Sequence, residues 1–184
     1  MAQSQSIFGL CNEMSVAGIK ELKLSAKTNT GDPIEYPIDV VIKNGDEAII
    51  LGSINETART ITIGEQTTEY VQPVVDTSLF TEELTEDRRG KYYTQTIDFS
   101  FPKVELFTNN QIKDFLFDTS GQLAIANAYA IITDNNDVEW IVGYDLPLIV
   151  ETLEVDINPD GGDNLYKMVL VGKSYNRIRR YENV

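Results

Sequence analysis

Histidine is absent from this chain of 184 residues, and cysteine and tryptophan occur once each. Without histidine the chain cannot form a Ser-His-Asp or Cys-His catalytic pair, a His-ligated zinc site or an imidazole general base. The single cysteine, Cys11, excludes an intrachain disulfide and a CxxC metal or redox site. These absences remove several large enzyme classes.

Long apolar runs are also missing, since none approaches the 18 residues that a membrane span needs. The first ten residues (MAQSQSIFGL) have neither the basic region nor the long apolar region of a secretion signal. We therefore expect no membrane partner and a cytoplasmic origin, which suits one unpaired thiol.

Positive charge is scarce. The chain has 15 lysines and arginines against 29 aspartates and glutamates, a formal charge of −14. Binding to a phosphate backbone normally needs a basic face, so this balance argues against ordinary nucleic-acid binding. It suits a soluble protein that repels nucleic acid or its own copies. The length predicts one domain, residues 1–184.

What the sequence does contain is repeated alternation of apolar and polar residues, which is typical of half-buried strands. Asn44-Gly45 and Asp134-Asn135-Asn136-Asp137 have the composition of hairpin turns. Pro73 cannot donate a ladder hydrogen bond, so the strand that contains it is expected at a sheet edge. The expected strands are 19–27, 40–42, 48–51, 59–64, 67–75, 91–103, 128–133, 138–143, 146–157 and 165–172.

A single short helix is expected over Gln111 to Asp118, because Ile112, Phe115 and Leu116 have the spacing of one buried helical stripe. Many strands at short spacing with one small helix indicate a mainly-β fold. We predict an antiparallel β-sandwich or barrel with one short flanking helix.

Three segments break the strand pattern. Residues 76–90 are predicted to be a long loop or assembly arm, residues 1–16 a possible N-terminal arm, and residues 174–184 a basic C-terminal tail. A solvated loop and a frayed terminus are the plainer alternatives. Tyr92 is expected on the wet face of its strand. The candidate subunit-interface residues are Glu82, Glu83, Arg88, Arg89, Tyr92, Arg177, Arg179 and Arg180.

The acidic residues include one possible metal-binding pattern and several carboxylate pairs. Asp156, Asn158, Asp160 and Gly161 match the first half of an EF-hand loop, but position 12 is Lys167 where a bidentate glutamate is required. A hairpin turn explains these residues better than calcium does. Carboxylate pairs such as Asp134 with Asp137 fall in turns expected to be wet, whereas a catalytic dyad needs one proton donor held in an apolar pocket. We expect no catalytic residue, metal site or cofactor.

One part of the chain resembles a known family. The strand Lys91 to Lys103 (KYYTQTIDFSFPK), the short helix after it and the hairpin segment AYAIITDNNDVEWIVGYDLPL are similar to virion structural proteins of tailed bacteriophages, especially those of Bacteroides-like hosts. The closing strand Leu165 to Lys173 fits the same pattern, and Gly18 to Leu22 fits it more loosely. The similarity covers about Tyr92 to Lys173.

This resemblance implies a non-enzymatic, tail-tube-like, neck-connector or tail-hub protein, made in the host cytoplasm and located in the virion. Such proteins form homo-oligomeric rings that contact other tail or neck proteins, and DNA passes through the lumen without specific binding. An acidic subunit would give that lumen a negative charge that repels the phosphates of DNA. The competing hypothesis is a monomeric β-sandwich module that binds carbohydrate or a protein ligand at its hairpin turns.

Overall fold

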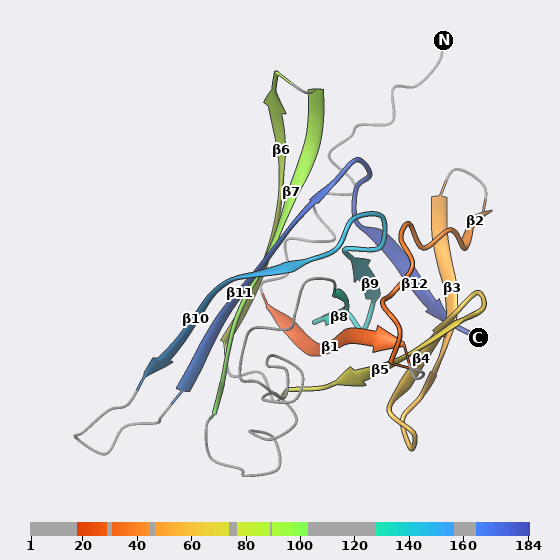
Figure 1. The fold of residues 1–184 in the computed structure, drawn as a ribbon, viewed down its shortest axis with the longest axis horizontal. Coiled ribbons are helices and arrows are strands. Elements are labelled where there is room, and N and C mark those ends of the chain that lie inside the picture. The colour runs from red at the N-terminus through yellow and green to blue at the C-terminus, as the bar shows by residue number, and fades with distance from the viewer. Residues whose placement is uncertain are drawn as a thin grey trace.

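The computed structural model describes residues 18–28, 31–44, 47–73, 77–88, 90–102, 128–156 and 165–184. Within these residues the secondary structure is entirely strands and turns (Figure 1). The strands are β1 (Ile19–Thr28), β2 (Val41–Asn44), β3 (Glu47–Asn55), β4 (Thr60–Ile63), β5 (Gln66–Val71), β6 (Thr77–Asp87), β7 (Gly90–Pro102), β8 (Tyr129–Asp134), β9 (Glu139–Val142), β10 (Ile149–Asp156), β11 (Leu165–Ser174) and β12 (Arg179–Asn183). No helix in the described residues is long and apolar enough to cross a membrane.

Seven strands close into a barrel in the order β12-β9-β8-β1-β5-β4-β3. Closure depends on β12, which pairs antiparallel with β9 and parallel with β3. β2 and β4 pair with different halves of β3, residues 47–50 and 53–55 respectively. The closed barrel removes strand edges that would otherwise be open to other chains.

The other four strands form a separate antiparallel sheet in the order β10-β11-β7-β6. Its long strands cross one side of the barrel, and the β6–β7 hairpin extends well beyond it (Figure 1). Ser78 on β6 joins the two units, since its Oγ accepts a hydrogen bond from Ile19 N at 3.0 Å and donates one to Ile19 O at 2.9 Å.

Two apolar cores follow from strand alternation, because successive side chains point to opposite faces. On β8, Tyr129 and Ile131 fill the barrel interior, while Ala130 and Ile132 face the four-stranded sheet. The core between sheet and barrel includes Leu22, Leu24, Ile97, Phe99, Trp140, Val142, Leu148, Met168 and Leu170. The barrel core includes Ile50, Ile61, Ile63, Tyr70, Ile141, Tyr144 and Tyr181.

The mainly-β fold class is confirmed, with a closed barrel in which β12 and β3 pair in parallel and a second, antiparallel sheet. Strand β7 has one buried face as expected, although Ser100, on the face expected to be wet, is only 4% exposed. Gln95, Ile97 and Phe99 are buried on one face, and Asp98 on the other face is exposed. The predicted helix over residues 111–118, the N-terminal arm 1–16, Cys11 and most of the turn at Asp156 to Asp160 lie outside the described residues.

The prediction of a long loop over residues 76–90 is wrong. Residues 77–87 form β6, which pairs with β7 along its whole length from Thr77 opposite Ser100 to Asp87 opposite Gly90. The sequence of β6 does not alternate between apolar and polar residues, because one of its inward positions is occupied by a carboxylate, Glu82. From sequence alone, a polar residue is assigned to the surface, and only the structure shows that it is buried against a partner.

Two further expectations are corrected. Residues 174–184 are not a free tail, since residues 179–183 form β12 and close the barrel. The strand over residues 67–75 is not an edge strand, because β5 lies between β1 and β4. β5 ends at Val71, so Pro73 lies after the strand and interrupts no ladder bond.

Candidate functional site

The most connected polar residue in the four-stranded sheet is Glu82, whose side chain is only 5% exposed. Its Oε2 accepts a hydrogen bond from Arg177 Nε at 3.0 Å. Its Oε1 accepts from Ile178 N at 2.7 Å and from Gln95 Nε2 at 3.0 Å. The carboxylate therefore ties the β6–β7 hairpin to the connection that leads into β12. Charge-assisted bonds of this kind are stronger than neutral ones.

Asp145 holds the same connection from the barrel side. Its Oδ2 accepts hydrogen bonds from Ser174 Oγ at 2.8 Å, Tyr175 N at 3.1 Å and Asn176 N at 3.3 Å. Residues 175–178 are thus held by two carboxylates, one from the sheet and one from the barrel. We call Glu82, Asp145 and the segment 175–178 the junction.

The arginines expected at a subunit interface make contacts within the chain. Arg177 pairs with Glu82, Arg179 Nε donates to Tyr144 OH at 3.1 Å, and Arg180 Nε lies 3.7 Å from a Glu182 oxygen. Arg177 precedes β12, whereas Arg179 and Arg180 lie on it. Arg179 reaches Tyr144 in the segment after β9, and Arg180 lies beside Glu182 of its own strand. A role for these arginines between subunits stays a prediction.

The other candidate interface residues lie around the hairpin. Glu83 and Arg88 are exposed. Tyr92 is half-buried, and the Lys173 ammonium sits 4.7 Å above the centre of its ring, a cation–π distance. Arg89 lies outside the described residues. Of the eight candidates, the structure brings Glu82 and Arg177 into direct contact.

The outer face of the four-stranded sheet points away from the barrel. Its register places Leu79 of β6 in one row with Asp98, Val169 and Thr152, and Thr81 in the next row with Thr96, Val171 and Ile149. Leu79 is 54% exposed and Ile149 is 51% exposed. The face is therefore a mixture of threonine, branched apolar and charged side chains, and its most exposed apolar residues lie on the two outer strands.

Both outer strands present an edge. Among the described residues, β6 is paired with β7 alone and β10 with β11 alone. The outward N–H and C=O groups of an edge strand are a template for pairing with another chain. β6 is long, at 11 residues, and lies on a hairpin that extends beyond the barrel (Figure 1).

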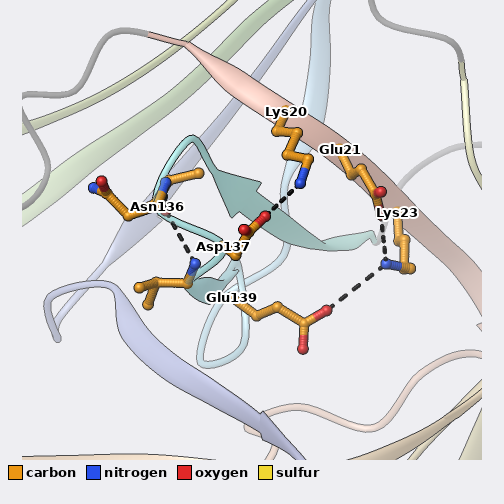
Figure 2. Close-up of polar contacts among 8 residues, drawn as sticks. Lys20, Glu21, Lys23, Asn136, Asp137 and Glu139 are labelled. Atoms are coloured by element: carbon orange, nitrogen blue, oxygen red, sulfur yellow. Dashed lines mark hydrogen bonds and ion pairs between the residues drawn. The ribbon is translucent and has the colours of Figure 1, made fainter.

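A second polar cluster lies at the barrel wall and was not anticipated from the sequence. Lys23 is 4% exposed and points away from Leu22 and Leu24, toward the barrel interior. Its Nζ lies 3.3 Å from Glu21 Oε2 and 3.7 Å from Glu139 Oε1 (Figure 2). The sequence did contain a sign of this cluster, because polar residues occupy alternate positions of β1, on the face opposite two leucines. Such a pattern indicates either a wet face or a polar interior, and only the closed barrel decides between them.

Burial raises the pKa of Glu139 above its ordinary value of 4.5, and the positive charge of Lys23 only partly opposes this effect. The folded protein then binds the proton more tightly than the unfolded chain does. This carboxyl therefore adds stability at low pH, and that contribution is lost as the pH rises from 4.5 through the raised pKa.

We expect the difference in unfolding free energy between wild type and Glu139→Gln to shift toward the wild type as the pH falls from 7 to about 4.5. Urea unfolding at several pH values measures this difference. Glu65→Gln, at an exposed turn position, is the matched control for removing one negative charge. A difference that stays constant with pH, or follows that of the control, would contradict the assignment.

The carboxylates Asp134 and Asp137 serve the β8–β9 turn. Asp134 Oδ1 accepts from Asn136 N at 2.8 Å and Val138 N at 3.0 Å, and its Oδ2 accepts from Trp140 Nε1 at 3.1 Å. Asp137 forms an exposed ion pair with Lys20 of β1 (Figure 2). Within the described residues, no group of three or more acidic, cysteine or histidine side chains is arranged to hold a metal ion.

Comparison with known proteins found no matching family, no matching curated protein and no matching solved structure.

Proposed function

We propose that this chain is a non-enzymatic structural subunit of a bacteriophage tail or neck, which assembles into a ring or tube with an acidic lumen through which DNA passes. The observation that carries the proposal is the four-stranded antiparallel sheet with one edge at β6 and the other at β10. The barrel packs against the inner face of this sheet. The sequence pattern of residues 92–173 supports the same class of protein.

The topology of this sheet allows head-to-tail pairing. Four antiparallel strands alternate in direction, so β6 and β10 run in opposite directions. Rotation about an axis along the strands leaves each direction unchanged, and the β10 of the next copy would meet β6 antiparallel. A contact between two different surfaces of identical subunits closes a ring when the rotation closes. Each copy would then contribute four strands to a continuous wall.

The charge of the outer face supports an acidic lumen. The inner face of the sheet packs on the barrel, so the outer face would line the channel. Among the outer positions whose side chains the structure describes, the charged residues are the carboxylates Glu83, Asp87, Asp98 and Glu154 and the lysines Lys167 and Lys173. With an overall charge of −14 per copy, such a wall would repel phosphates and let DNA slide.

The test is molar mass by light scattering after size exclusion, from dilute to concentrated protein and in buffers of low and high salt, followed by negative-stain imaging. Closed rings or stacked tubes are expected. A monomer of 20.6 kDa under all these conditions would contradict self-assembly and favour the monomeric binding module, with ligand screening as the next step.

A pair of surface variants tests which face assembles. Leu79→Ser with Ile149→Ser removes the two most exposed apolar residues of the outer face and should lower the assembled fraction. Exposed substitutions usually change stability by less than about 0.5 kcal/mol, so folding should be preserved. The matched control is Val41→Ser with Ile42→Ser on β2, also exposed but on the barrel. Equal loss of assembly in both pairs would contradict the assignment of the face.

A further inference from the structure

The four-stranded sheet has an uneven distribution of charge between its inner and outer strands. β6 and β10, which form the edges, contain four and three carboxylates respectively and neither lysine nor arginine. The inner strands β7 and β11 contain three lysines and one carboxylate. Each edge of the sheet is therefore acidic, and the compensating cations lie between the edges.

Some of these carboxylates are neutralised within the subunit. Glu82 is bonded to Arg177, and Glu86 lies 3.6 Å from Lys91 Nζ. Glu83 on β6 and Glu151 at the bulge of β10 are both exposed. Glu83 faces outward between Thr81 and Thr85, close to the edge that a neighbour would use. Each edge thus keeps at least one exposed carboxylate without a cation beside it on its own strand.

We infer that the sheet edges carry an electrostatic barrier, so that assembly through β6 and β10 proceeds only when salt screens their carboxylates. The inference rests on the proposed ring. When β6 of one copy approaches β10 of the next, acidic strands meet, and like charges across a strand pair are destabilising. The net charge of −14 on each copy adds a longer-range repulsion of the same sign. Free subunits at low salt would stay apart, although their edges are complementary in direction.

The distance over which this repulsion acts determines which salt concentrations should be compared. The Debye length is about 10 Å at 0.1 M salt and about 3 Å at 1 M, so exposed charges across a strand pair are screened only at the higher concentration. We expect the concentration of protein at half-assembly to fall about tenfold or more between these two NaCl concentrations. Light scattering at a series of protein concentrations measures it.

Two variants separate the edge charges from the overall charge. Glu83→Gln with Glu151→Gln should assemble at 0.1 M NaCl and lose most of the salt dependence. Glu65→Gln with Glu69→Gln removes the same charge from exposed positions of the barrel and should behave as wild type. Glu151→Lys alone should place a cation against the acidic β6 edge of the next copy. Its assembly should then be strongest at low salt, the reverse of wild type.

The outcomes distinguish the two proposals. Assembly that is equally strong at both salt concentrations, with the edge variant indistinguishable from wild type, would overturn the electrostatic barrier and leave the ring intact. A barrel control that assembles as readily as the edge variant would assign the effect to net charge and also overturn it. Failure of every protein to assemble at either salt concentration, including both edge variants, would overturn the ring itself.

Discussion

Replacing Glu82 by alanine is expected to lower the free energy of unfolding by about 3 kcal/mol. The change removes three hydrogen bonds to a carboxylate that is almost fully buried. Arg177 is 38% exposed, so its side chain can form hydrogen bonds with water that partly replace the one it loses. The side chain of Gln95, which is 1% exposed, and the backbone N–H of Ile178 cannot replace their lost hydrogen bonds with water. Urea unfolding monitored by fluorescence of the single tryptophan, Trp140, measures the change.

The adjacent residue provides the matched control. Glu83 is exposed and lies on the opposite face of β6, so Glu83→Ala should change stability by less than about 0.5 kcal/mol. Glu82→Gln keeps an acceptor for Ile178 N and should fall between wild type and Glu82→Ala. Equal stability losses in the two alanine variants would show that the junction contributes nothing specific.

A local measurement shows where the effect of Glu82→Ala arises. Amide hydrogen exchange at Ile178 should become faster in the variant, because this N–H loses its 2.7 Å bond to the carboxylate. Amides of β4 and β5, on the far side of the barrel from the junction in the strand order, should change only as much as the global stability does. Uniform acceleration at all positions would indicate that the junction has no local role.

Replacing Gly52 by alanine is expected to destabilise the protein by about 2–4 kcal/mol. A Cβ atom at this position would lie 2.7 Å from Thr62 O, 2.7 Å from Tyr181 OH and 2.9 Å from Tyr181 Cε2. Thr62 is paired with Ser53 in the β3–β4 ladder, so its carbonyl cannot withdraw without loosening the barrel. Glycine is required here because two barrel strands and a buried tyrosine ring meet at one backbone position.

A double-mutant cycle identifies which contact matters. Tyr181→Phe removes the hydroxyl, which has no hydrogen-bond partner among the described residues, and should therefore cost little alone. Combined with Gly52→Ala it should recover part of the lost stability, since one of the close contacts disappears. Ser53→Ala, next in the chain and exposed, is the control for β3. Strictly additive effects of the two changes would contradict steric conflict at Tyr181.

Much of the strand content was predictable because it is local. The alternation in β7 follows from residues 93–101 alone, and Asn44-Gly45 and the Asp134 turn have sequences that favour hairpins. The hairpins β2–β3, β8–β9 and β10–β11 were therefore located correctly. A hairpin needs only its own two strands and its turn, so neighbouring residues carry the information.

The candidate site was only partly predictable, because its key contacts join distant residues. Glu82 and Arg177 were both selected as charged interface residues, but nothing near either one shows that they bond to each other across 95 positions. Glu82 at an inward position also prevented the prediction of β6 as a strand. Lys23 was missed because a polar residue between two leucines is equally consistent with a solvent-exposed face.

The sequence by itself determined the mainly-β class, three of the hairpins and the acidic character, because strand period, turn chemistry and charge are properties of neighbouring residues or of composition. Only the tertiary structure decided that β12 closes a barrel against β3, that β6 pairs with β7, and that the two acidic strands lie at the sheet edges. Strand order and closure depend on which faces are buried against each other. That is a comparison of free energies over the whole molecule, and no local pattern contains it.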